Sequence, residues 1–410
     1  MGGGLLQLVA YGAQDIYLTG NPQITFFKVV YRRHTNFSIE SVEQTFNGGI
    51  DFGNKVLCNI ARSGDLVSNM YLRVTLPALN QTQSSGTYHG YVNSIGNAII
   101  KEVEIKVGGQ AMDKQYGDWM EIWGELTNTS SHFDGYCEMV GKYESDISLQ
   151  SNATAAKTYN VPIPFWFCRN PGLALPLIAL QYHEVVVDLT FRALNELTVS
   201  DVAITTAQDS TGSTASITNA ALWVDYVYLD TDERRRFAQN SHEYLIEQLQ
   251  HNGIESLAAS TSTFSANLGF NHPCKELLWV ITEDSNTQAS TSAGNDRFNF
   301  SASGSDSFDN VKLQFNGQER FVARDARYFR TVQPYNHHTR VPTKHIYSYS
   351  FGLRPEEHQP SGTCNMSRLD NVTMKFNFAS GISASSLKLY AINYNVLRIM
   401  SGMAGLAYSN

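Results

Sequence analysis

One short stretch of alternating residues occurs twice in the chain, and this repeat constrains the fold more than any other feature of the sequence. Residues 103–110 and residues 311–318 both place an apolar side chain at every second position and then end in a glycine-containing turn. The apolar positions are Val103, Ile105 and Val107 in the first copy and Val311, Leu313 and Phe315 in the second. A period of two predicts a half-buried β-strand, and glycine provides the positive φ angle that a tight turn needs.

Three other pairs of segments repeat in the same order along the chain. The two copies described above are separated by 311 − 103 = 208 residues. The other pairs are residues 64–74 with 273–280 at an offset near 277 − 66 = 211, residues 185–189 with 372–376 at 372 − 185 = 187, and residues 223–226 with 392–394 at about 394 − 226 = 168. Any all-β chain contains strands that look alike by chance, so each pair alone is weak evidence. Four pairs in order, with a shrinking offset, predict one β unit that is duplicated with shorter late loops in its second copy.

Length and charge limit the class of protein. A chain of 410 residues is too long for one ordinary domain and suits two domains of roughly 200 residues. Only 17% of the residues are charged and the net charge is −8, which argues against direct binding of nucleic acid, because such a surface must be basic. One basic run, residues 234–236, directly follows Asp230, Asp232 and Glu233. We interpret it as an exposed or interface turn of a helix and not as a phosphate site.

The cysteines and the first residues indicate a soluble protein from a reducing compartment. Five cysteines are scattered along the chain without a C-x-x-C pair, which indicates neither a disulfide framework nor a zinc site. The first residues lack the basic segment and long apolar core of a secretory signal. The longest apolar run, residues 173–180, contains Pro176 and is far too short to cross a bilayer.

Short strand patterns separated by turn clusters run through both halves of the chain. This regular spacing is typical of a sandwich or jelly roll, and it predicts an all-β fold with short helices in the connections. The expected strands are residues 26–31, 38–46, 55–61, 71–76, 99–107, 161–167, 185–189 and 222–229 in the first half, and residues 264–268, 277–282, 311–315, 346–351, 372–378 and 387–398 in the second. The prolines within residues 161–167 suggest that this strand lies at the edge of a sheet.

Two helices and three long loops are expected between these strands. An apolar stripe at helical spacing predicts a helix over residues 115–126 that packs into the core. The stripe consists of Trp119, Ile122, Trp123 and Leu126. Asp230 is expected to cap a short helix that extends through Gln239. The long polar loops are residues 127–160, 197–220 and 283–309.

These patterns divide the chain into an arm, two β units and a bridge. The expected limits are residues 1–26 for the arm, 27–229 for the first jelly roll, 230–250 for the bridge and 251–410 for the second jelly roll. The arm carries apolar side chains that some packing must cover, namely Leu5, Leu6, Leu8 and Val9. A neighbouring subunit or surface would cover them, and packing beneath the chain's own first domain is the alternative.

No arrangement of residues in the sequence points to catalysis, a cofactor or a metal ion. The sequence contains no G-x-S-x-G, P-loop, G-x-G-x-x-G or H-E-x-x-H motif. His337, His338 and His345 form a histidine cluster, but adjacent residues on a strand point to opposite faces, so we interpret the cluster as an exposed loop. The His-Glu pairs at residues 183–184 and 242–243 are interpreted as groups that form hydrogen bonds at an interface.

Glycosylation is a further possibility in the long loops. Asn-x-Ser/Thr sequons are expected by chance in a chain rich in these residues, so only those in the long loops are retained as glycan sites. These candidates are Asn128, Asn152 and Asn299.

One stretch near the start of the chain is distinctive enough to indicate a family. It comprises residues 12–28 and is followed by residues 31–37. Together these segments resemble the start of the major capsid protein of nucleocytoplasmic large DNA viruses, and the coat protein of algal chloroviruses in particular. The resemblance continues at residues 171–177, 182–184, 223–226, 242–248, 271–273, 313–318, 359–365, 393–398 and 405–408. It fails mainly in the three long loops, where surface decoration and host contact would reside.

The resemblance implies a fold and an assembly. Proteins of this family consist of two eight-stranded antiparallel jelly rolls in tandem, and three chains form a homotrimer. Two similar units in each of three chains make six, so the trimer is pseudo-hexagonal and tiles the outer shell of a large icosahedral double-stranded DNA virus. The predicted duplication would then present six nearly equivalent edges to neighbouring capsomers.

The resemblance also implies a location and further partners. The protein would lie in the outer capsid shell of a virion assembled in the host cytoplasm, with minor capsid proteins beside it. In the family the N-terminal arm lies on the inner side above an internal viral membrane, and we carry this over to Leu5, Leu6, Leu8 and Val9 as a hypothesis. The long loops would lie on the outer face, where a host receptor could bind.

A carbohydrate-binding or carbohydrate-active jelly-roll protein is the alternative interpretation. Aromatic residues in loops would suit stacking against sugars, but the expected loops contain mostly Ser, Thr, Asn and Gly. An enzyme would also need convergent carboxylates, which the sequence does not place. The resemblance therefore favours a structural protein without catalytic residues, cofactor or metal.

Overall fold

The computed structural model describes residues 3–26, 32–82, 89–143, 153–287, 294–378 and 381–408. The chain forms two compact units, Met1–Asn36 and Phe37–Asn410. The first unit contains α1 (Gly3–Val9), η1 (Ala13–Asp15) and α2 (Ile16–Thr19), and none of its helical residues is buried. The strand expected at residues 26–31 lies, apart from its first residue, outside the described residues.

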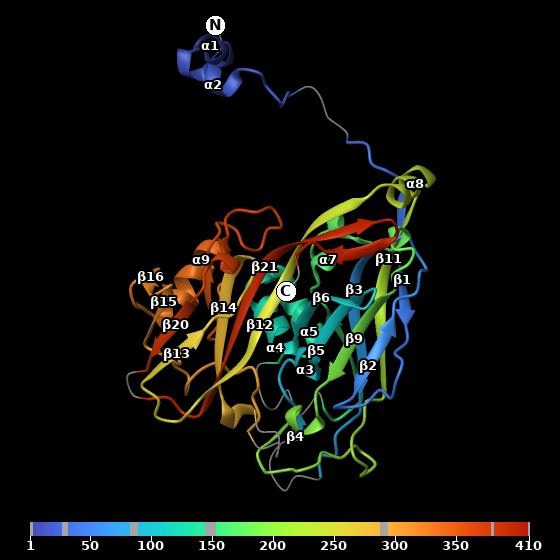
Figure 1. Cartoon of the computed structure of the whole chain (residues 1–410), viewed down its shortest axis with the longest axis vertical. Helices are drawn as coiled ribbons and strands as arrows, with labels where there is room; N and C mark the ends of the chain where they lie inside the picture. The colour runs from blue at the N-terminus through green and yellow to red at the C-terminus, as the bar shows by residue number, and fades with distance from the viewer. Residues whose placement is uncertain are drawn as a thin grey trace. The chain divides into compact units, whose positions relative to one another are not determined.

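The first half of the larger unit is an eight-stranded antiparallel roll (Figure 1). One sheet has the order β1 (Phe37–Gln44), β11 (Asn219–Leu229), β3 (Leu66–Leu76) and β7 (Lys157–Pro162). The other has the order β2 (Lys55–Asn59), β9 (Val185–Phe191), β5 (Ile100–Val107) and β6 (Gln110–Tyr116). The short strand β8 (Leu175–Pro176) pairs with β3, and β4 (His89–Tyr91) pairs with β10 (Thr198–Ser200).

The second half repeats this strand order. Its sheets are β12 (His242–Leu257), β21 (Ser385–Met400), β14 (Pro273–Glu283) and β18 (Tyr347–Ser350), and β13 (Thr263–Asn267), β20 (Val372–Asn377), β15 (Asn310–Phe315) and β16 (Gln318–Glu319). Three short strands extend them, namely β17 (Arg324–Asp325) beside β15, β19 (Cys364–Asn365) beside β14 and β22 (Met403–Leu406) beside β21. Both halves are therefore jelly rolls, and the predicted fold of two tandem eight-stranded rolls is confirmed.

Strand pairing confirms the offset between the two copies of the repeated stretch. In the first roll Val103 of β5 pairs with Leu189 of β9, and in the second Val311 of β15 pairs with Phe376 of β20. These equivalences give 311 − 103 = 208 and 376 − 189 = 187, the values predicted for the two segments. All four side chains are buried in the core of their own roll.

The turns that end the repeated strands are also equivalent. Gly108 and Gly109 join β5 to β6 with φ angles of 58° and 82°. Asn316 and Gly317 join β15 to β16 with φ angles of 49° and 84°. Two consecutive residues with positive φ define the two-residue hairpin turn that glycine and asparagine favour.

Two of the offsets, predicted as near 211 and about 168, differ from the observed ones by four residues and by one residue, and a β-bulge at the same place in both rolls fixes the observed values. Ser68 in β3 and Lys275 in β14 are the extra residues, and Tyr226 and Asn393 are the partner-strand residues just beyond them. Aligning the bulges gives 275 − 68 = 207 in place of 211, and 393 − 226 = 167 in place of 168. A shift of one residue turns a strand's side chains to the opposite face, so the corrected values decide which residues face the core.

The helices lie in the connections. The predicted helix at residues 115–126 is α4 (Gly117–Thr127), and the predicted helix after Asp230 is α8 (Thr231–Gln239), whose first backbone N–H donates to the Asp230 side chain. The arginines of α8 are exposed, as expected. The other helices within the described residues are α3 (Ile95–Ile99), α5 (Ser130–Val140), α7 (Trp166–Arg169), η2 (Pro171–Leu173), η3 (Leu177–Ala179), η4 (Leu194–Glu196), η5 (Asp284–Thr287), the π-helix η6 (Tyr328–Val332), α9 (Gln333–His337) and η7 (Met366–Arg368). Within the described parts of the chain, no helix is long and apolar enough to cross a membrane.

The expectation of an irregular loop over residues 127–160 is wrong. Residues 130–140 form α5, and β7 begins at Lys157. The polar composition of α5 hid the helix, since only one of its residues, Val140, is buried. The strand expected at residues 161–167 also ends early, because β7 stops at Pro162 and α7 follows. The edge position expected for it is confirmed, as β7 is the last strand of its sheet.

The limits proposed for the domains stay a prediction. Within the proposed bridge, residues 230–250, α8 is followed by the start of β12 at His242. Each roll has an apolar core of its own. In the second roll Trp279 packs against Tyr347 and Phe329 at ring-centroid distances of 6.0 and 5.2 Å.

Candidate functional site

The interface between the two rolls, which we call the joint, contains several buried charged side chains and is the candidate functional site. It is centred on α4, which follows β6 directly and contacts the second roll through Trp119 and Asp118. Asp118, Glu121 and Glu125 lie at positions i, i+3 and i+7 of this helix, so their carboxylates share one face. All three side chains are buried, with exposed fractions of 8%, 1% and 1%. A buried carboxylate needs compensating partners.

The second roll and the end of α5 provide those partners. Lys388 Nζ of β21 donates to Asp118 Oδ2 at 2.7 Å, and Lys344 Nζ donates to Glu121 Oε1 at 2.7 Å. Glu125 accepts from the backbone N–H and hydroxyl of Thr343 at 3.3 and 3.2 Å. Lys142, just after α5, forms ion pairs with both Glu121 and Glu125. Breaking a buried pair of this kind on one side is strongly destabilising.

Burial and ion pairing shift the pKa values of these carboxyl groups in opposite directions. Burial alone would raise the pKa of Asp118, but Lys388, Arg192 and Arg297 outweigh it and hold that pKa well below its usual range. For Glu121 burial is likewise outweighed by Lys344 and Lys142, which lower its pKa to about 2. Both groups therefore remain charged at neutral pH.

Aromatic and backbone contacts complete the joint. The ring of Trp119 lies 5.5 Å from that of Tyr390 of β21, which is fully buried. Asp113 of β6 accepts from the backbone N–H of Leu249 in β12 at 3.0 Å. Burial raises the pKa of Asp113 to about 6, although these hydrogen bonds oppose the increase. Gln248 donates through its side-chain amide to the carbonyl of Met112.

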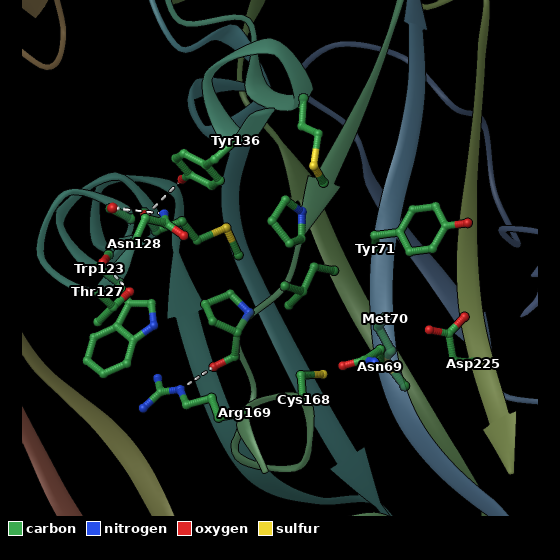
Figure 2. A pocket seen from close by; sticks show the side chains of 16 residues that line it. Asn69, Met70, Tyr71, Trp123, Thr127, Asn128, Tyr136, Cys168, Arg169 and Asp225 are labelled. Carbon is green, nitrogen blue, oxygen red and sulfur yellow. Dashed lines mark hydrogen bonds between the residues drawn. The ribbon is translucent and has the colours of Figure 1, made fainter. Parts of the chain in front are cut away.

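A cavity of about 420 Å³ lies on the first roll, between the outer face of its sheet and the helices α4, α5 and α7 (Figure 2). Figure 2 shows Trp123 and Arg169 on one side of it and Tyr71 and Asp225 on the other. The Arg169 guanidinium lies 4.1 Å from the centre of the Trp123 ring, and its Nε donates to the carbonyl of Pro164 at 3.0 Å. The lining is mostly apolar, so it suits an apolar side chain better than a charged ligand.

The structure corrects the interpretation of the histidine cluster. His338 is not in an exposed loop, because its side chain is fully buried between two glutamates. Its Nε2 lies 2.9 Å from Glu276 and its Nδ1 lies 2.8 Å from Glu356. Burial would lower the pKa of His338, but the two carboxylates outweigh burial and raise it to about 10. Within the described residues, no group of three His, Cys, Asp or Glu side chains could hold a metal ion.

The other histidines singled out from sequence form hydrogen bonds. His183 Nδ1 accepts from the backbone N–H of Ala404 at 3.1 Å, which ties the first roll to the end of the second. His242 Nε2 lies 2.8 Å from the carbonyl of Phe237 in α8.

The candidate glycan sites differ in their surroundings. Asn128 is half-buried at the end of α4, and its Nδ2 donates to the carbonyl of Gly124 at 2.9 Å, as Figure 2 shows. Asn299 is also half-buried, and its Oδ1 accepts from the hydroxyl and backbone N–H of Ser301 at 2.7 and 3.2 Å. Asn152 lies outside the described residues.

The apolar residues of the arm are exposed. Their exposed fractions are 53% for Leu5, 59% for Leu6, 80% for Leu8 and 72% for Val9. The acidic face of α4 was not predicted from the sequence, because the aromatic stripe is the stronger pattern in the same residues. The spacing of Asp118, Glu121 and Glu125 was the available signal, since three acids on one face of a helix that also packs into a core need buried partners.

Comparison with known proteins identifies the family. The family described as "Major capsid protein N-terminus" matches residues 25–230, and the family described as "Large eukaryotic DNA virus major capsid protein" matches residues 233–405. The chain is 51% identical over 434 residues to a major capsid protein of Pyramimonas orientalis virus, with all of both chains covered. The chain belongs to the major capsid proteins of large eukaryotic DNA viruses.

Two further matches agree with this family. The major capsid protein of Paramecium bursaria Chlorella virus 1 is 41% identical over 455 residues, again with all of both chains covered. A quasi-atomic structure of that virus's capsid matches this chain with a TM-score of 0.79 and 36% identity, covering 94% of this chain and all of the other. The resemblance found in the sequence is thus confirmed, and the joint and cavity described above belong to a capsid protein.

Proposed function

We propose that this chain is the subunit of the outer shell of a large icosahedral double-stranded DNA virus and that three copies form one pseudo-hexagonal capsomer. The observation that carries the proposal is the repeated strand order of the two rolls, which are joined by an interface that contains buried ion pairs. Membership of the major capsid protein family supports it.

Geometry explains why the repeat suits this task. Two similar rolls in each of three chains give six similar units around a three-fold axis, and six similar edges let a capsomer contact neighbouring capsomers in a hexagonal lattice. A lattice of this kind requires that the rolls of one chain keep a fixed spacing. The ion pairs of Asp118 and Glu121 hold the two rolls together in that way.

The arm is proposed to lie on the inner face of the shell. Leu5, Leu6, Leu8 and Val9 are largely exposed and form an apolar surface that a partner must cover. A neighbouring capsomer, a minor capsid protein or the internal membrane beneath the shell would each provide such cover. Synthesis and assembly in the host cytoplasm belong to the same proposal.

The outer loops are proposed to contact the host and to carry any glycans. An N-linked glycan attaches to the Nδ2 atom of asparagine. In Asn128 this atom is held by the carbonyl of Gly124, whereas Asn299 forms its described hydrogen bonds through Oδ1. We therefore favour Asn299 over Asn128, and Asn152 remains a candidate.

Light scattering behind size exclusion tests the capsomer directly. Three chains of 45.7 kDa give 3 × 45.7 = 137.1 kDa. We expect a stable particle of that mass with a hexagonal outline in electron micrographs. A chain that stays at 45.7 kDa at every concentration would contradict the proposed trimer.

A further inference from the structure

The outer face of the second roll's sheet is covered within the chain. Leu278 and Val280 of β14 and Tyr390 and Ile392 of β21 point away from the core of the second roll and pack against the first roll, with exposed fractions of 0–1%. The covering element is the end of β6 followed by α4, whose Trp119 contacts Tyr390.

Among the described residues, the equivalent face of the first roll is covered only in part, by the helices that line the cavity of Figure 2. With the offsets of 207 and 167, Leu278 corresponds to Tyr71 of β3 and Tyr390 corresponds to Trp223 of β11. The rings of Tyr71 and Trp223 stack on each other at 6.2 Å and are only half-buried. Beside them on β1, Phe37 and Ile39 are 53% and 58% exposed. The cavity of Figure 2 opens next to the same face, with Tyr71 and Asp225 in its lining.

The covering element also has a counterpart, which lies in the second roll. Tyr116 at the end of β6 pairs with Glu102, and Asp325 at the end of β17 pairs with Asn310. These pairs are equivalent because 310 − 102 = 208. A helix begins directly after each strand, α4 after Tyr116 and residues 326–337 after Asp325. We call residues 320–337 the docking segment.

The docking segment exposes apolar side chains that nothing in the described chain covers. Val322, Val332 and Tyr335 have exposed fractions of 68%, 42% and 78%. In Figure 1 the α9 end of this segment and its neighbours β15 and β16 lie at the left of the larger unit, while β1 and β11 lie at the right. The segment therefore does not reach the outer sheet face of the first roll in its own chain.

The docking segment and the outer sheet face of the first roll differ in charge. The position of Asp118 in α4 corresponds to Arg327 in the docking segment, since 325 − 116 = 209 and 327 − 118 = 209. Arg320, Arg324 and Arg327 are all exposed. On the first roll, the outer sheet face and the adjoining helix α5 carry four acidic residues, and the basic residues there are Arg73 on the sheet and Arg169 in the lining of the adjacent cavity. These acidic residues are Glu43, Asp134, Asp225 and Glu138. The segment and the face thus have opposite charge, which favours their association.

We propose that the outer face of the sheet β1-β11-β3-β7 binds the docking segment of a second copy of this chain, with apolar side chains of that segment over Tyr71, Trp223 and the adjacent cavity. The contact repeats between chains the contact that α4 makes within the chain, with the charges reversed. It rests on the proposed function and specifies the partner surfaces of the capsomer. Because the two surfaces differ, the contact is head-to-tail, and it forms a closed ring when the third chain meets the first.

Two substitutions and a mixing experiment test this contact. Ile39→Asp places a charge on the sheet face, and Tyr335→Asp places one on the docking segment; both positions are exposed, so each variant should fold. Each variant alone should lose the trimer and elute at 45.7 kDa. Ile254→Asp is the matched control, because Ile254 is also an exposed strand isoleucine (61%) but lies outside both surfaces, and it should keep the trimer.

Mixing the two variants separates a head-to-tail contact from any other kind. The docking segment of Ile39→Asp and the sheet face of Tyr335→Asp are both intact, so one good contact can form between the two chains. We expect a heterodimer of 2 × 45.7 = 91.4 kDa that does not close into a trimer.

The outcomes distinguish the inference from the proposed function. A wild-type chain that is monomeric would overturn the trimer itself. A wild-type trimer that survives both substitutions would leave the trimer standing and overturn the assigned surfaces. Loss of the trimer in both variants without a heterodimer on mixing would also overturn the head-to-tail pairing.

Discussion

Lys388 Nζ lies 2.7 Å from Asp118 Oδ2, and both side chains are almost completely buried although they belong to different rolls. Arg192 and Arg297 each approach the other oxygen of Asp118 at 3.9 Å. One carboxylate therefore faces three cations in the interior of the joint. Removing it leaves the buried Lys388 without its ion-pair partner, although Arg192 and Arg297 keep Glu196, whereas removing one cation leaves two others beside Asp118.

This asymmetry predicts unequal effects of two substitutions. Asp118→Asn should lower the free energy of unfolding by about 3–5 kcal/mol, the range for one partner removed from a buried pair. Lys388→Met should cost less, because Asp118 keeps two cations nearby. In the double variant the two losses should not add, since the residues are in contact. Urea unfolding at fixed protein concentration measures all three values.

The exposed ion pair of Glu243 and Arg398 provides the control for this series. Both side chains are more than half exposed, so Glu243→Gln should change the free energy of unfolding by no more than about 1 kcal/mol. Equal losses for Asp118→Asn and Glu243→Gln would show that the joint adds no more than a surface pair.

Acid should weaken the joint within a defined pH range. The pKa of Glu121 is lowered from 4.5 to about 2, so the folded state binds fewer protons than the unfolded state between these values. The stability that Glu121 contributes is complete above pH 4.5 and is lost as the pH falls toward 2. The pKa of Asp113 is raised from 3.8 to about 6, so the stability that Asp113 contributes increases as the pH falls from 6 to 3.8. Urea midpoints measured from pH 7 to pH 3 should therefore fall most steeply below about pH 4.5.

One substitution tests whether Glu121 is the group that causes this acid dependence. Glu121→Gln should flatten the fall in the urea midpoint below pH 4.5, because the titrating group is gone. The exposed Glu138 of α5 is the matched control, and Glu138→Gln should leave the slope unchanged. An unchanged slope in Glu121→Gln would remove Glu121 as its source.

The two equivalent turns should differ in their tolerance of alanine. Gly108 and Gly317 both have positive φ, so alanine is strained by about 1–2 kcal/mol at either position. A Cβ at Gly108 would lie 2.4 Å from His183 Nδ1, whereas a Cβ at Gly317 would meet open space. Gly108→Ala should therefore be the more destabilising of the two in thermal unfolding. Similar losses would mean that the His183 ring moves aside freely.

Removal of the arm should separate capsomer formation from shell formation. We expect a chain without residues 1–26 to form trimers, because the proposed contact surfaces lie in the larger unit. Shell assembly should be impaired, because the apolar side chains that we place on the inner face are gone. Electron microscopy of assembly reactions measures the effect, and normal shells from the shortened chain would contradict the proposed role of the arm.

The sequence was sufficient to predict the features that depend on local pattern. The alternation of Val103, Ile105 and Val107 predicted β5, and its second copy predicted β15, because a period of two is a property of the strand itself. The caps and stripes of α8 and α4 predicted those helices for the same reason. Helix α5 was missed because it has little buried surface, so its sequence shows no apolar stripe.

Features that depend on distant residues could not be predicted in this way. The bulge at Ser68 is visible only in its pairing with β11, and it provides the point at which β3 can be aligned with β14. The partners of Glu121 lie more than 200 residues away at Lys344 or across α5 at Lys142, and nothing in their local sequence marks them. His338 was misinterpreted for the same reason, because its glutamate partners come from other segments.

Equivalent helical positions of the two rolls carry opposite charges, Asp118 in α4 and Arg327 in the docking segment. This difference restricts the order in which the rolls can be arranged in a ring. Two copies of one roll could occupy the six places of a ring in any order if they were interchangeable. With an acidic helix on one and a basic helix on the other, placing two first rolls side by side would bring α4 against an acidic sheet face. Only strict alternation of first and second rolls avoids this repulsion. Under the proposed contact, the two rolls of one chain are therefore similar in fold and yet not interchangeable in the ring.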